Sequence, residues 1–196
     1  TLLFTANVPT ASGDHAQRLV LRGETPDPAV YPAQVDGIDV EIEIQHRIMS
    51  AIDSHSQVPV APIVGYEADH TVAGRPFFVM RFVEGQVPIE SPLYTLEGFF
   101  ADATPEQRHT LVHNGLKAMA DLHAVDWRAA GLEWLIPDGV SPGTPAQLAL
   151  WEGFGLGELR GRSHPLLEQA WDRLRTGMSA DRSIGLCWGD PRPGNI

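Results

Sequence analysis

The last eleven residues of the chain, 186–196, constrain its fold more than any other stretch. Their sequence, LCWGDPRPGNI, places two prolines and two glycines within six consecutive positions. Proline fixes φ and lacks an N–H, and glycine adopts backbone angles that other residues resist, so a regular helix is excluded here. The pattern predicts a short strand, a rigid loop and the start of a second strand, with Asp190 and Asn195 on the same side.

A carboxylate and an amide on a stiff loop are suited to phosphoryl transfer. Asp190 could orient an attacking hydroxyl and accept its proton, while the side-chain oxygen of Asn195 could hold Mg²⁺ against nucleotide phosphates. Most of the catalysis in such reactions is positioning and charge stabilisation, which requires a rigid loop. The same residue types are the commonest turn formers, so a surface β-turn is the alternative.

Composition limits the class of protein and its partners. A chain of 196 residues, 43% hydrophobic and 20% charged, can bury a sizeable core in one or two lobes. The net charge of -11 argues against a nucleic-acid partner, because such proteins need a basic surface. No apolar run is long enough to span a bilayer, so no membrane partner is expected. Cys187 is the single cysteine, which excludes an internal disulfide and indicates a reducing compartment, by default the cytoplasm.

Two short strands are predicted near the N-terminus, at residues 1–6 and 18–22. Residues 9–17 between them are polar, so the simple prediction is an antiparallel hairpin with a long loop. The second strand ends in Arg22, where a cation beneath a nucleotide site could bind phosphates. An exposed arginine at a strand end is the ordinary alternative.

One amphipathic helix is predicted after a proline-containing loop at residues 23–37. Asp39 is expected to cap a helix that runs from about Val40 to Ile52. Its apolar face consists of Val40, Ile44, Ile48, Met49 and Ile52. Its polar flank carries three side chains that could hold Arg22, with solvated helix residues as the alternative: Glu41, Glu43 and Gln45.

A hinge between two lobes is predicted near residue 85. After a brief strand at residues 63–66, the sequence FFVMRFV at residues 77–83 is nearly continuously apolar, which predicts a buried strand. Glu84 and Gly85 end this run. Backbone groups at such a point are free to bond a ligand, and a plain core strand is the alternative.

Two further helices are predicted in the C-terminal half. Thr104, Pro105 and Gln107 supply an N-cap, a first-turn proline and a capping box for a helix that continues to about Asp126. Its apolar stripe is expected to be core: Leu111, Val112, Leu116, Met119 and Leu122. The second helix covers residues 165–176, with an expected buried side of Leu166, Leu167, Ala170, Trp171 and Leu174.

Two other patterns are weaker indications of a functional site. His109 and His113 are one helical turn apart, but no glutamate of a zinc-hydrolase motif separates them and no third ligand is evident. Residues 139–143 match the G-x-S-x-G motif of hydrolases. Pro142 follows Ser141, however, and has no N–H to bind an oxyanion, which makes a hydrolase a distant third hypothesis.

Four segments in chain order resemble the aminoglycoside phosphotransferase-like kinase family: LVLR at 19–22, FFVMRFVEG at 77–85, LHAVD at 122–126 and WGDPRPGN at 188–195. Within this family the chain is similar to the kinase-like domains associated with acyl-CoA dehydrogenases. The resemblance implies an α+β, protein-kinase-like fold of two lobes. Residues 1–85 would form an N-lobe of antiparallel sheet plus helix that ends in the hinge, and residues 86–196 a mainly helical C-lobe.

The resemblance also implies a role for each matching residue. Asp190 would be the catalytic aspartate, Asn195 the Mg²⁺ ligand, and Arg22 the phosphate-binding cation in place of a strand lysine. The backbone that meets adenine would be that of Met80, Arg81, Phe82 and Val83. The implied cofactors are ATP and Mg²⁺, and the implied reaction transfers the γ-phosphate to a hydroxyl of a small molecule. The alternative is a degenerate kinase-like module that binds a nucleotide or a partner without turnover.

The sequence departs from the family pattern in three ways. Trp188 stands where the family often has histidine, and Gln45 falls where the acid of the N-lobe helix is expected, so that Glu41 or Glu43 would replace it. The family's glycine-containing nucleotide loop would precede Thr1, and its second metal-binding aspartate would follow Ile196. We therefore expect a fragment, truncated at both ends, that carries the catalytic base and not the whole catalyst. The oligomeric state and the substrate do not follow from the sequence.

Overall fold

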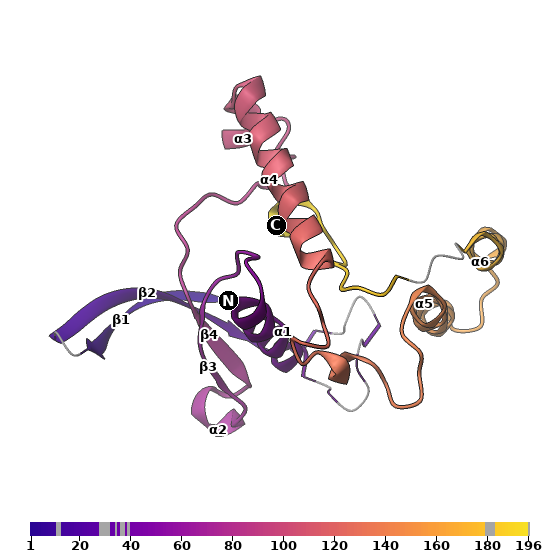
Figure 1. The fold of residues 1–196 in the computed structure, drawn as a ribbon, viewed down its shortest axis with the longest axis horizontal. Coiled ribbons are helices and arrows are strands. Elements are labelled where there is room, and N and C mark those ends of the chain that lie inside the picture. Colours follow the sequence, from indigo (N-terminus) through magenta and orange to yellow (C-terminus); the bar gives the residue numbers. More distant parts are fainter. Residues whose placement is uncertain are drawn as a thin grey trace. The chain divides into compact units, whose positions relative to one another are not determined.

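The computed structural model describes residues 1–10, 13–27, 32, 33, 35, 38, 40–178 and 183–195. Contacts along the chain divide it into two compact units, whose elements are drawn in Figure 1. The first unit comprises residues 1–24, 40–132 and 185–196, and the second comprises residues 25–39 and 133–184. No helix in the described part of the chain is long and apolar enough to cross a membrane.

The first unit contains a four-stranded antiparallel sheet in the order β1-β2-β4-β3. The strands are β1 (Leu2–Thr10), β2 (Gly13–Gly23), β3 (Ile63–Glu67) and β4 (Phe77–Arg81). The predicted N-terminal hairpin is confirmed, but its strands pair from Leu2 with Leu21 as far as Thr10 with Gly13. The described residues of that polar segment, 9, 10 and 13–17, are strand residues instead, because most of them lie in an exposed part of the ladder where polar side chains are tolerated. Residues 11 and 12, which belong to the predicted loop, lie outside the described residues.

Phe78 is the centre of the core that joins the sheet to helix α1 (Glu41–His55). Its side chain is fully buried, and α1 packs on β3 and β4. The predicted strand at residues 77–83 is shorter than expected and ends at Arg81, which is exposed. The prediction of a fully buried strand is therefore wrong at this end of the run.

Helix α1 begins at Glu41 and runs three residues beyond its predicted end. Val40 occupies the N-cap position, where its side chain makes no capping hydrogen bond, and Asp39 lies outside the described residues. A carboxylate oxygen of Glu24 instead accepts the N–H of Ile42 at 2.9 Å, which satisfies one free donor of the first turn. Ile42 is buried although the predicted apolar face omits it.

Helix α2 (His70–Ala73) lies between β3 and β4 in the sequence, and α3 (Phe99–Asp102) and α4 (Pro105–His123) follow β4. The capping box of α4 is confirmed, because the hydroxyl of Thr104 accepts the N–H of Gln107 and the side chain of Gln107 accepts the N–H of Thr104. The helix ends three residues before Asp126, whose carboxylate accepts two N–H groups of the next turn.

The predicted apolar stripe of α4 is not core. Three of its members are exposed: Leu111, Val112 and Leu116. The buried apolar side chains of this region come instead from the segment after the helix: Val125, Trp127, Ala130 and Leu132. Amphipathic spacing identifies a face that needs a partner, and no described element covers this one.

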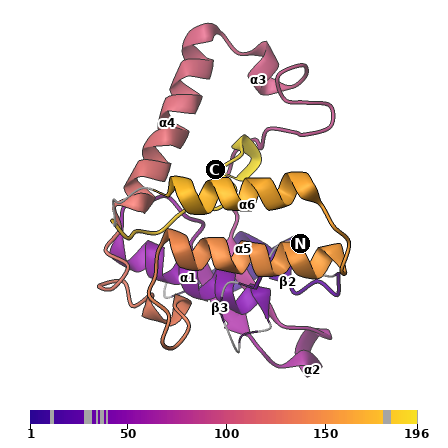
Figure 2. The same ribbon diagram turned by 90° about the vertical axis from the view of Figure 1, so that its right-hand side faces the viewer.

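The second unit contains α5 (Thr144–Leu159) and α6 (Pro165–Gly177), which lie side by side in Figure 2. Helix α6 was predicted, although Leu166 and Leu174 on it are exposed. Helix α5 was not predicted, because glycine has a low helix propensity and three occur within five residues. One of them, Gly155, allows close packing, since a Cβ there would lie 3.4 Å from the ring of Trp171.

Replacing Phe78 with alanine should destabilise the protein by about 3–5 kcal/mol, because it leaves a cavity between the sheet and α1. Urea unfolding followed by circular dichroism measures this change. Val72, which is exposed on α2, provides the matched control, and Val72→Ala should change stability by less than about 0.5 kcal/mol. Equal shifts of the two urea midpoints would contradict the assigned core.

Burial of His46 should make the stability of the folded protein depend on pH. Its ring stacks on Tyr66 with centroids 4.9 Å apart, and its buried Nδ1 has no hydrogen-bond partner in the described part of the chain. Burial lowers the pKa of His46 below 6.5; nearby Glu43 opposes this shift and Arg47 adds to it. The unfolded chain therefore binds more protons below pH 6.5, so this group reduces stability as the pH falls from 6.5 through its folded pKa.

The variant His46→Phe keeps an aromatic ring in this position and removes the titration. Urea midpoints at pH 5.5 and 7.5 should show that the variant gains stability relative to the wild type at the lower pH. The other titrating groups contribute to both proteins and cancel in this comparison. A wild-type-to-variant difference that is the same at both pH values would exclude the buried neutral imidazole.

Candidate functional site

The loop at residues 189–195 brings Asp190 and Asn195 together. The side-chain Nδ2 of Asn195 donates to Oδ2 of Asp190 at 3.0 Å and lies 3.2 Å from its main-chain oxygen. The main-chain N–H of Asn195 donates to the oxygen of Arg192 at 2.8 Å, within a short 3₁₀ turn (Pro193–Asn195). These bonds close the loop on itself, so the carboxylate and the amide are held by local contacts.

Arg192 and Glu90 complete this cluster, and neither was among the predicted site residues. Arg192 Nε lies 3.0 Å from Oδ2 of Asp190, the same oxygen that accepts from Asn195. At its other edge, Nη1 of Arg192 lies 2.9 and 3.1 Å from the two carboxylate oxygens of Glu90. Oδ1 of Asp190 has no hydrogen-bond partner among the described residues. From the sequence, only Arg192 could have been predicted as part of this cluster, because it lies within the loop, whereas Glu90 lies far away in the sequence.

The segment that leads into this loop is not the predicted strand. Residues 183–188 form no regular secondary structure, and the second predicted strand is replaced by the 3₁₀ turn. Gly185 fixes the segment against the end of α4, because a Cβ there would lie 2.9 Å from the main-chain oxygen of His123. Gly189 has φ of +86°, which favours glycine. Trp188 supports the loop through its main-chain oxygen, which accepts the N–H of Asp190 at 3.2 Å.

Arg22 lies on the face of the sheet that carries α1. Its cross-strand neighbour is Phe78, and the adjacent pair is Val20 with Met80, so these four side chains share one face. The ring of His46 on α1 lies 6.4 Å from that of Phe78. Arg22 is exposed and forms no ion pair with any described residue.

The predicted partners of Arg22 on α1 bind elsewhere. Gln45 donates to a carboxylate oxygen of Glu41 at 2.5 Å, and Glu43 lies 3.5 Å from Arg47 one turn further along the helix. The expected ion pair between Arg22 and an acid of this helix is therefore not formed. Helix neighbours at i and i+4 are within reach of each other without any change of backbone, which favours these local contacts.

The predicted hinge after β4 is anchored on the sheet. The N–H of Arg81 donates to the oxygen of Pro62 at 2.9 Å, and the N–H of Phe82 donates to the oxygen of Arg18 at 3.0 Å. The guanidinium of Arg18 also lies 3.8 Å above the ring of Phe82 and forms an ion pair with Glu84. The N–H of Val83 has no partner among the described residues, so this segment presents one free donor.

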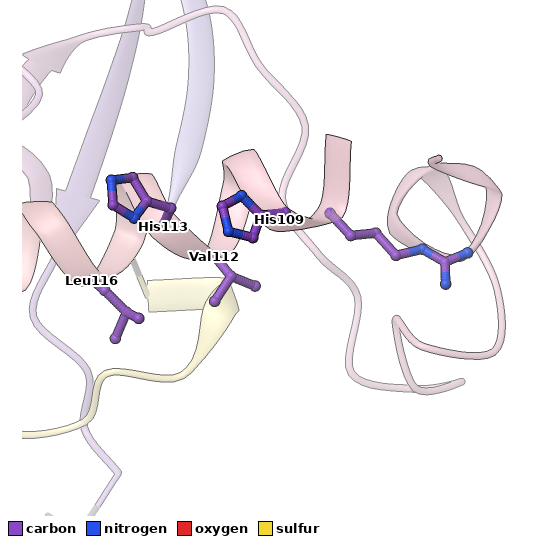
Figure 3. A pocket seen from close by; sticks show the side chains of 5 residues that line it. His109, Val112, His113 and Leu116 are labelled. Atoms are coloured by element: carbon purple, nitrogen blue, oxygen red, sulfur yellow. The ribbon is translucent and has the colours of Figure 1, made fainter. Parts of the chain in front are cut away.

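A hollow along α4 contains none of the predicted site residues. Its lining consists of Arg108, His109, Val112, His113 and Leu116 (Figure 3). The two imidazole rings stack with centroids 6.0 Å apart, and no carboxylate lines the hollow. The described residues contain no group of three or more His, Cys, Asp or Glu that could hold a metal ion. This hollow therefore offers no carboxylate ligand for the Mg²⁺ of phosphoryl chemistry.

Comparison with known proteins identifies a family and curated relatives of this chain. A family model described as the phosphotransferase enzyme family matches residues 12–196. One relative is the probable acyl-CoA dehydrogenase IBR3 of Arabidopsis thaliana, which is 29% identical over 126 residues. The alignment covers 64% of this chain and 14% of the relative. The chain therefore corresponds to a small part of that relative's length.

Proposed function

This chain belongs to the phosphotransferase enzyme family, as its four ordered motifs predicted, and we propose that it transfers the γ-phosphoryl group of ATP to a hydroxyl of a small molecule. The fold is α+β and protein-kinase-like, with an antiparallel sheet and a helix packed on it. The boundary between an N-lobe and a C-lobe at residue 85 is part of the same proposal.

The difference between the two carboxylate oxygens of Asp190 carries this proposal. Oδ2 accepts a hydrogen bond from Asn195 and forms an ion pair with Arg192, which restrains the carboxylate. Oδ1 is left without a partner in the described structure, so it is the oxygen available to an acceptor hydroxyl. A general base must lie within hydrogen-bond reach of the proton that it removes, and a carboxylate fixed at one oxygen meets this requirement at the other.

Asn195 fits the role of a Mg²⁺ ligand. A carboxylate can only accept hydrogen bonds, so the NH₂ group of Asn195 faces Asp190. The carbonyl oxygen of this amide has no partner among the described residues and is available to a cation. Amide and carboxylate oxygens are hard ligands of the kind that Mg²⁺ prefers. When bound, Mg²⁺ would neutralise charge on the nucleotide phosphates.

Residues of the sheet and hinge would bind the nucleotide. Arg22 is exposed and unpaired in the described structure, on the same face as Met80, which supports a role in binding phosphates. The N–H groups of Arg81 and Phe82 are engaged with the sheet. Adenine would therefore meet the N–H of Val83, the donor that the hinge leaves free.

The alternative function is a kinase-like module that binds a nucleotide or a partner without turnover. Two observations favour it: Arg22 has no acidic partner on α1, and Trp188 replaces the histidine frequent in the family. The active and the degenerate protein differ in one measurable respect, which is the formation of ADP from ATP and Mg²⁺ in the presence of acceptors.

Two classes of acceptor merit testing. The Arabidopsis relative is named a probable acyl-CoA dehydrogenase, so the first class that we propose is acyl compounds that carry a hydroxyl. The net charge of -11 instead favours a cationic acceptor such as an aminoglycoside, by long-range attraction. We place the reaction in the cytoplasm, because the single cysteine excludes an internal disulfide.

Asp190→Ala should abolish phosphoryl transfer and leave ATP affinity largely unchanged, because the base acts on the acceptor and not on the nucleotide. Loss of a general base lowers turnover by about 10²–10⁴-fold. The measurement compares ADP formation with the acceptor panel, and ATP binding by calorimetry, in the native protein that contains this sequence. Asp121→Ala, an exposed acid on α4, is the control. Unchanged turnover in Asp190→Ala would refute the assignment.

Val83→Pro should weaken ATP binding by about three- to tenfold, the effect of losing one hydrogen bond. Proline removes the N–H, which has no partner within the described protein, so the sheet contacts of the hinge are retained. Val83→Ala removes most of the side chain, keeps the N–H, and should bind ATP as the wild type does. Equal ATP affinity in the proline and alanine variants would place adenine elsewhere.

A further inference from the structure

The 189–195 loop contacts a segment that is remote in the sequence, residues 87–90, at two separate points. One is the ion pair between Arg192 and Glu90. The other is Gly194, where a Cβ would lie 3.5 Å from the main-chain oxygen of Pro88 and 4.0 Å from a methyl group of Val87. Pro88 is buried. The segment therefore packs against the loop through its backbone as well as through one charged side chain.

Arg192 links this segment to the carboxylate of Asp190. Its guanidinium is planar and rigid, so a carboxylate that holds Nη1 also fixes the direction of Nε. Without Glu90, the long side chain of Arg192 would recover its rotamer freedom, because its one remaining ion pair is with Asp190. Glu90 thus determines how firmly Oδ2 of Asp190 is held.

We propose that Glu90 is a positioning residue for phosphoryl transfer. It holds Nη1 of Arg192, keeps Nε on Oδ2 of Asp190, and so leaves Oδ1 directed to the acceptor hydroxyl. The inference rests on the proposed role of Asp190 as the base. Glu90 acts through Arg192 and touches neither the nucleotide nor the acceptor.

The exposure of this ion pair favours a role in positioning over a role in stability. The side chains of Arg192 and Glu90 are 52% and 55% exposed. Ion pairs of such exposure contribute little to folding. Substitutions at these positions should therefore leave a folded protein in which catalysis can be measured.

Glu90→Gln should lower kcat for ADP formation from ATP and Mg²⁺ on the order of tenfold, because the carboxylate of Asp190 is less well oriented. The KM for ATP should stay within about twofold, since no nucleotide contact is lost. Glu90→Asp keeps the charge and should recover part of the rate. An unchanged kcat, or an increase in KM alone, would overturn the proposal.

A double variant tests whether Glu90 acts through Arg192. If it does, Glu90→Gln has no further effect in a protein that already carries Arg192→Gln. Independent, additive losses in kcat would overturn the proposal. Asp121→Asn is the matched control, because it breaks another exposed ion pair, with Lys117 on α4, and should leave kcat unchanged.

A second measurement does not depend on turnover. Exchange of the Nε–H proton of Arg192 with water, followed by NMR, should be several-fold faster in Glu90→Gln and unchanged in Asp121→Asn. Unchanged exchange in Glu90→Gln would overturn the proposed contact. An inactive wild-type protein would refute phosphoryl transfer itself, whereas an active wild type with an equally active Glu90→Gln variant would refute only the role of Glu90.

Discussion

The antiparallel pairing of β2 with β4 is the interaction on which the sheet and the segment after β4 depend. It joins two segments that are distant in the sequence and continues past the end of β4, where Phe82 donates to the main-chain oxygen of Arg18. The same pairing places Arg22 opposite Phe78, the most buried side chain of the sheet. Because successive side chains alternate between faces, a shift of one residue would turn Arg22 away from Met80 and α1.

Two polar contacts, made by Glu24 and Glu90, join segments that are distant in the sequence. Glu24 lies just beyond Arg22 and accepts an N–H from the first turn of α1, so the end of β2 supports the helix that packs on the sheet. Glu90 follows the hinge and holds Arg192 in the loop of Asp190. In both cases a carboxylate that is exposed or half-buried binds a segment that is remote from it in the sequence.

The sequence predicted the features that local chemistry determines. The capping box at Thr104, the hairpin of β1 and β2, and the loop between Gly189 and Asn195 each rest on residues that are close in the chain. Helix α5 was missed because its glycines lower the intrinsic helix propensity, which packing against Trp171 overrides.

The features that the sequence did not predict depend on distant residues. The contacts of Glu24 and Glu90 join segments with no shared pattern, so no spacing rule identifies them. The expected ion pair between Arg22 and an acid of α1 was predicted wrongly for a related reason. Glu41 and Glu43 instead contact neighbours on their own helix, Gln45 and Arg47. Burial of the α4 stripe was also predicted wrongly, since a periodic pattern shows which face is apolar but not what covers it.

The unequal hydrogen bonding of Asp190 bears on regioselectivity. With Oδ2 engaged by two side chains, the proposed base would present a single oxygen, and its direction is restrained by a loop closed within five residues. On an acceptor with several hydroxyls, only the group that reaches Oδ1 while facing the phosphate would be activated. Under the proposed function, the position of phosphorylation would then be determined by the protein's loop geometry rather than by the intrinsic acidity of the acceptor's hydroxyls.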